Sequence, residues 1–150
     1  MNNYKDKFNK RIYKYALDVI RFVEKLPKEI STQVLVKQLV RSGTSVSANI
    51  IEAQSASSKK DYINFYTIAL KSANESKLWI SLARDTGKIS KEDANKLLEE
   101  TIEIAKILGA SVITMKNKNK IWILRYRFEI WDFTFKIELC EIIQLKKSEI

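Results

Sequence analysis

Apolar residues recur at intervals of three and four along most of this chain, which is the period of an amphipathic helix. Four such stretches are separated by short breaks, and they predict helices over residues 4–26, 31–56, 59–86 and 90–115. Three glycines and one proline in 150 residues leave few places to turn. The elements must therefore be few and long.

The predicted boundaries coincide with residues that start or stop helices. Pro27 ends the first helix because proline lacks the backbone N–H that a helix interior needs. The second helix is expected to begin at Ser31 or Thr32, either of which can cap exposed N–H groups. Three further boundary signals are a capping box formed by Ser58 and Asp61, a C-terminal cap at Gly87, and a helix start at Ser90.

The middle of the second predicted helix consists of residues with small side chains. Its small residues, which let a neighbouring helix approach closely, are Ser42, Gly43, Thr44, Ser45, Ser47 and Ala48. Gly43 costs about 1 kcal/mol relative to alanine in a helix interior, so a packing gain should offset it.

Polar residues lie beside this small-residue segment and on the third predicted helix. We expect Arg41, Asn49, Glu52, Lys71 and Glu75 to form a structural polar network, since a buried charge needs a partner. The alternative is a ligand or RNA site at the same residues.

The stretch RSGTSVSANIIEAQSASSKKDYINFYTIALKSANESK, residues 41–77, resembles the proteins of the 23S ribosomal RNA intervening-sequence family. The matching elements are residues 39–42, 44–46, 49–53 and 58–62, and the resemblance extends over roughly residues 8–117. It implies an all-α fold, an antiparallel up-down four-helix bundle, that assembles into rings, often pentamers, without an established catalytic activity. It also makes Glu75 a candidate partner for Arg41. The chain is similar, too, to the accessory bundle protein of diversity-generating retroelements, a basic partner of a reverse transcriptase and its RNA.

The net charge of +9 favours an anionic partner such as nucleic acid, although a lysine-rich composition is also common in proteins of AT-rich genomes. The candidate nucleic-acid contacts are Lys7, Lys10, Arg11, Lys14, Lys37, Lys59 and Lys60. Tyr4, Tyr13 and Tyr15 are interleaved with the first of them and could stack on bases. The alternative is a solvated face whose tyrosines pack at a subunit boundary.

Enzymatic function is disfavoured because the chain has no histidine, which removes common zinc sites, Ser-His and Cys-His pairs and Glu-x-x-His di-iron bundles. We therefore expect no catalytic residues, no cofactor, no metal and no small-molecule substrate. Cys140 is the single cysteine, and no apolar run approaches the length of a membrane span. These features predict a cytoplasmic protein without a membrane partner.

Two predictions concern assembly and the end of the chain. Glu99, Glu100 and Glu103 make the most acidic surface, which we hypothesise meets the basic front of the first helix in the next subunit. Residues 1–117 are expected to form the bundle, and residues 118–150 a basic linker and an aromatic-rich extension. The extension fits strand alternation and helical spacing alike, and it is either a poorly selected addition or a strip that packs on the bundle or on a partner.

The leading functional prediction is a non-enzymatic homo-oligomer, possibly a pentamer, that binds structured RNA or other nucleic acid through a basic surface. The alternative is a protein-interaction scaffold whose positive charge is incidental.

Overall fold

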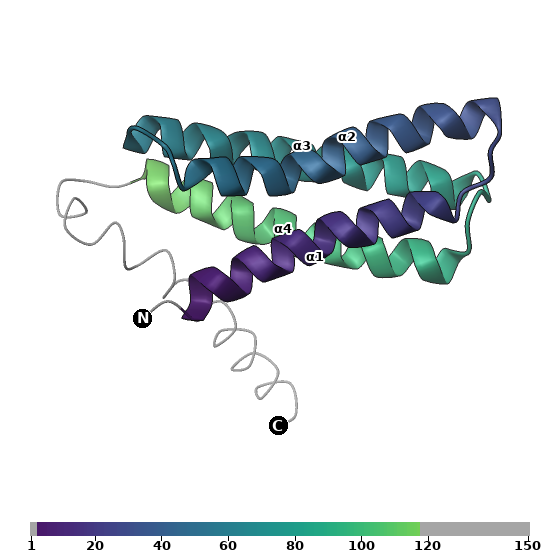
Figure 1. Ribbon diagram of the computed structural model, residues 1–150, viewed down its shortest axis with the longest axis horizontal. Helices are drawn as coiled ribbons and strands as arrows, with labels where there is room; N and C mark the ends of the chain where they lie inside the picture. The colour runs from purple at the N-terminus through teal and green to yellow at the C-terminus, as the bar shows by residue number, and fades with distance from the viewer. Residues whose placement is uncertain (1–2, 118–150) are drawn as a thin grey trace, which may run out of the picture.

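The computed structural model of this chain describes residues 3–117, which form four helices. These are α1 (Asn3–Glu24), α2 (Ile30–Ala53), α3 (Lys59–Asp85) and α4 (Lys91–Lys116). They run up and down in turn, each beside the next in sequence, and α1 also contacts α4 (Figure 1). The predicted all-α antiparallel bundle is confirmed. The predicted extension, residues 118–150, lies outside the described residues.

The core consists of buried residues spaced alternately by three and four in every helix, the spacing that packs helices at small crossing angles. In α3 this series begins at Tyr66 and ends at Ala83, and in α4 it begins at Ala94 and ends at Met115. Alanine and serine fill much of the α3 side of the core. This small-residue face allows α2 and α3 to approach each other closely.

Three of the predicted boundary residues act as expected. Ser58 Oγ accepts a hydrogen bond from the Asp61 N–H at 3.1 Å, and Ser90 Oγ accepts one from the Asp93 N–H at 3.1 Å. Gly87 follows α3 with a φ of 68°, and the next N–H, that of Lys88, donates to the Ala83 carbonyl. That bond closes the end of α3 because glycine adopts a left-handed conformation without strain.

The predicted start of α2 is wrong. The helix begins at Ile30, with Glu29 as its first flanking residue and no side-chain cap. Thr32 instead turns into the core, where its hydroxyl has no hydrogen-bond partner among the described residues. Glu29 forms an ion pair with Lys88 in the α3–α4 connection, and α2 begins one or two residues earlier than the serine and threonine pattern indicated.

Candidate nucleic-acid interface

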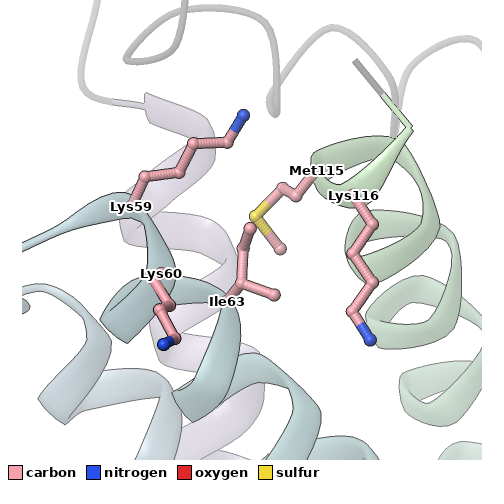
Figure 2. A pocket seen from close by; sticks show the side chains of 5 residues that line it. All are labelled: Lys59, Lys60, Ile63, Met115 and Lys116. Carbon is pink, nitrogen blue, oxygen red and sulfur yellow. The ribbon is translucent and has the colours of Figure 1, made fainter.

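Lysines gather where α3 begins and α4 ends. Lys59 and Lys60 occupy the first turn of α3, and Lys116 is the last residue of α4. All three are exposed and surround a groove of about 510 Å³ whose remaining lining residues are Ile63 and Met115 (Figure 2). We call this groove with its three lysines the basic groove.

The first half of α1 lies at the same end of the bundle (Figure 1). The Gln54 amide, just after α2, donates to Asn9 Oδ1 at 3.2 Å and so fixes the start of α1 beside the end of α2. Lys7 and Lys10 are exposed on this half of α1. Four of the seven predicted contact residues, namely Lys7, Lys10, Lys59 and Lys60, therefore share one end of the molecule.

The electrostatics of the basic groove favour an anion. The start of α3 is the positive end of its helix dipole, and this partial charge adds to the three ammonium groups. The nearest acid in sequence, Asp61, is engaged locally, since its carboxylate accepts a hydrogen bond from the Ser57 N–H at 3.1 Å.

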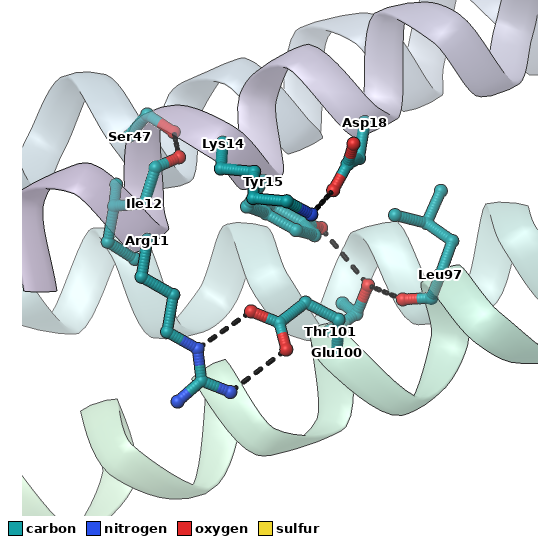
Figure 3. A network of polar contacts seen from close by, with 9 residues as sticks. All are labelled: Arg11, Ile12, Lys14, Tyr15, Asp18, Ser47, Leu97, Glu100 and Thr101. Atoms are coloured by element: carbon teal, nitrogen blue, oxygen red, sulfur yellow. Dashed lines mark hydrogen bonds and ion pairs between the residues drawn. The ribbon is translucent and has the colours of Figure 1, made fainter.

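The other three predicted contacts are placed differently. Arg11 donates to both carboxylate oxygens of Glu100, at 2.7 and 2.9 Å, and Lys14 donates to Asp18 at 2.7 Å (Figure 3). Lys37 is exposed in the first half of α2, toward the opposite end of the bundle. Arg11 thus joins α1 to α4, Lys14 forms an exposed pair within α1, and Lys37 does not join the basic groove.

Tyr15 does not belong to a stacking surface. Its side chain is buried, and its hydroxyl shares a hydrogen bond of 3.2 Å with the Thr101 hydroxyl (Figure 3). Burial raises the pKa of the Tyr15 phenol. The interleaved-aromatic hypothesis is wrong at this position because Tyr15, one turn after Ile12, falls on the inner face of α1. Tyr13 remains exposed.

Sequence reasoning did not include Lys116 among the candidate nucleic-acid contacts. The signal was present, because Met115 ends the apolar stripe of the fourth predicted helix and the next residue completes its last turn. In an antiparallel bundle the end of the fourth helix must lie beside the beginning of the third. Lys116 was therefore placeable beside Lys59 and Lys60.

The polar network is made mainly by small side chains between α2 and α3. Ser76 Oγ lies 2.9 Å from Ser42 Oγ, and Ser72 Oγ lies 3.0 Å from Ser45 Oγ. Asn49 joins this set within α2, where its amide donates to the Ser45 carbonyl at 2.8 Å. These bonds satisfy buried hydroxyls across the close contact and fix the register of the two helices.

Arg41 forms the expected ion pair with Glu75, but the pair is not buried. The Arg41 side chain is 62% exposed and that of Glu75 31% exposed. The serine contacts occupy the interior between α2 and α3, so the long side chains of Arg41 and Glu75 extend outward and pair at the surface. Breaking this pair therefore costs about 1 kcal/mol or less, rather than the 3–5 kcal/mol of a buried pair.

Glu52 and Lys71 are both exposed, and neither makes an ion pair within residues 3–117. The serine contacts place Lys71 about level with Val46 of α2, and Glu52 lies six residues further, about 9 Å along the axis. The prediction that Glu52 and Lys71 join the polar network is therefore not supported by any contact among the described residues, and the helix register keeps the two charges apart.

The acids of α4 also have partners in the same chain. Glu100 is bound by Arg11 of α1, and Glu103 accepts from Lys106 at 2.7 Å. Glu99 is exposed. The hypothesised contact between these acids and a neighbouring subunit stays a prediction.

Two further observations concern residues 3–117 alone. No group of three or more acidic, cysteine or histidine side chains is placed to hold a metal ion there. None of the four helices has the length and apolar content that crossing a bilayer requires.

Comparison with known proteins gives a family. Residues 5–110 match the model of the family described as 23S rRNA-intervening sequence protein. A crystal structure of a protein of unknown function from the S23 ribosomal protein family of Bacteroides thetaiotaomicron VPI-5482 is 36% identical, with a TM-score of 0.65. The match covers 69% of this chain and 96% of that one. No curated protein shows significant sequence similarity. The match over more than half of the chain, with a four-helix fold, shows that this protein belongs to the 23S rRNA-intervening sequence protein family.

Proposed function

We propose that this chain is a non-enzymatic, homo-oligomeric bundle of the cytoplasm that binds structured RNA at the end carrying the basic groove. The observation that carries the proposal is the grouping of Lys59, Lys60 and Lys116 around one groove, with Lys7 and Lys10 at the same end. Lysines so arranged can neutralise several phosphates of one ligand.

Structured RNA is the anion that we propose because the family description names 23S rRNA. The surface offers ammonium groups rather than a set of side chains shaped to read base edges. Recognition would therefore follow the shape and the phosphates of the RNA, as is usual for double-stranded regions. The proposal of a non-enzymatic role is supported by the absence of histidine from the sequence.

The test is the salt dependence of RNA binding by the full chain. A variant that combines Lys59→Glu, Lys60→Glu and Lys116→Glu should lose most of its affinity for a structured RNA. If three phosphate contacts are removed, the slope of log affinity against log salt should fall in magnitude by about 2 to 3.

A matched control changes the same charge elsewhere. Lys28, Lys91 and Lys96 are exposed lysines at the opposite end of the bundle, and their triple change to glutamate alters the net charge equally. We expect this control to weaken binding only slightly. Equal losses in the two variants would show that net charge alone holds RNA, and would reject the basic groove as the site.

A protein-interaction scaffold is the second candidate, and a different surface favours it. Ile30 and Val34 of α2 are 86% and 58% exposed, and Leu78 and Leu82 of α3 are 53% and 37% exposed. The Arg41–Glu75 pair shows that these helix halves lie side by side on one outer face. We call these four residues the outer apolar patch. It suits contact with protein, and it supports the self-association that we propose.

A further inference from the structure

The basic groove combines a positive rim with an apolar interior. Figure 2 shows the Met115 side chain reaching from α4 toward Ile63 of α3, with lysines on both helices around them. Ile63 is half-buried, so part of its side chain remains available for an apolar contact. A ligand that consists only of phosphates would leave this apolar part unused. An occupant with acidic and apolar side chains together would match both features.

Such a segment exists in this chain. Residues 128–142, FEIWDFTFKIELCEI, contain four acidic residues, one lysine and eight large apolar side chains. They are joined to the bundle by the residues that follow Lys116, which itself borders the groove. Ten residues separate Asn117 from Phe128, enough to span about 35 Å when extended.

We propose that residues 128–142 dock on the basic groove of the same chain. The acidic side chains face Lys59, Lys60 and Lys116, and apolar side chains of the segment contact the accessible part of Ile63, beside which Met115 lies buried. Tethering favours this occupant, because a short linker holds it at an effective concentration on the order of millimolar.

A consequence concerns the RNA site and rests on the proposed function. Since RNA phosphates and the docked segment would use the same three lysines, the two compete. The segment then lowers the affinity for weak, nonspecific anions, and only an RNA that contacts several lysines displaces it.

The docking is tested by cross-linking in the full chain, whose one natural cysteine, Cys140, lies inside the proposed segment. Lys60→Cys adds a second thiol at the groove, and Lys91→Cys adds one at an exposed lysine at the opposite end. The 23 residues from Asn117 to Cys140 can extend about 75 Å, so an undocked segment reaches both ends of the bundle. A short bis-maleimide should therefore give intramolecular product at Lys60→Cys at least about fivefold faster than at Lys91→Cys.

Charge variants make the result specific. In the Lys60→Cys background, Lys59→Glu with Lys116→Glu should slow the intramolecular cross-link about fivefold, because two ion pairs are lost. Adding Glu138→Lys and Glu141→Lys should restore part of the cross-linking rate, because the segment then carries positive charges opposite the new negative charges of the groove. Equal rates at the two ends, or no response to the groove charges, would overturn the docking. Cross-linked dimers whose yield rises with protein concentration would overturn it as well, because the occupant would then come from a second copy.

Adding structured RNA separates the two proposals. If both hold, RNA lowers the cross-linking rate at Lys60→Cys. If the rate is fast and RNA neither binds nor changes it, docking stands and the proposed RNA function fails. If RNA binds but the rates at the two ends are equal, the function stands and docking fails.

Discussion

At Gly43, α1 and α2 leave no room for a side chain. A Cβ placed there would lie 2.8 Å from Val19 Cγ1 and 2.9 Å from Val19 Cγ2. Val19 is fully buried and β-branched, and such a side chain is held in one rotamer within a helix. The valine therefore has no inexpensive way to move aside, and the glycine sets the distance between the two helices.

We expect Gly43→Ala to lower the free energy of unfolding by about 1–3 kcal/mol through overpacking. Helix propensity alone predicts the opposite, a gain of about 1 kcal/mol. Urea denaturation followed by circular dichroism measures the difference. Combining the change with Val19→Ala should give a loss smaller than the sum of the two single variants, since the added methyl then fills vacated space. A Gly43→Ala protein more stable than the parent would contradict the clash.

For single residues, the sequence predicted which side chains allow close packing or form an ion pair, but not which residues surround them. It predicted that the small residues around Gly43 admit a close helix, but it could not say that Val19 of α1 fills the space. It also paired Arg41 with Glu75 while placing them in a buried site. Burial of a long side chain depends on its exit direction between two helices, which helical periodicity does not define.

The predicted elements agree with the structure where a cap determines the boundary. Ser58, Gly87 and Ser90 each form the local hydrogen bonds that their positions indicated. The start of α2 was mispredicted because its determinant is not local. Glu29 pairs with Lys88, 59 residues later in the chain, and no short sequence window contains that contact.

The first turn of α4 makes bundle stability sensitive to acid. The Lys25 ammonium, which donates to Asp93 at 2.7 Å, lowers the pKa of Asp93, and the Ser90 hydroxyl adds to the effect. A carboxyl whose folded pKa lies below its unfolded value of 3.8 favours the fold above that pH. This contribution is lost as the pH falls through the lower folded value.

Asp93→Asn should therefore lower the melting temperature at neutral pH, and the gap to the parent protein should close as the pH drops below about 3.8. Thermal unfolding at a series of pH values measures it. Lys25→Gln serves as the partner variant, because it should raise the pKa of Asp93 back toward its ordinary value and shift the acid transition upward. A gap that stays constant down to pH 2 would exclude Asp93 ionisation as the cause.

The fold of the whole molecule was accessible from the sequence because each helix carries its own period and because the family resemblance spans most of the chain. The basic groove was only half accessible. Lys59 and Lys60 were identified, but joining them to Lys116 requires the antiparallel packing of α3 against α4. The assembly surface is harder to predict from the sequence than the groove. Apolar residues that face outward leave the helical period intact, so the pattern does not distinguish them from other surface residues.

The outer apolar patch leads to a prediction about assembly. Val34→Glu combined with Leu82→Glu should reduce the oligomer mass measured by light scattering, because charges would replace the apolar contact. Helicity should be retained, since both side chains are exposed. Ile113→Glu on α4, 61% exposed, is the matched control and should leave the mass unchanged.

Glu99→Lys combined with Glu103→Lys tests the acidic surface of α4 in the same light-scattering assay. Dissociation in that variant alone would assign assembly to α4, and a monomeric parent chain would contradict self-association itself.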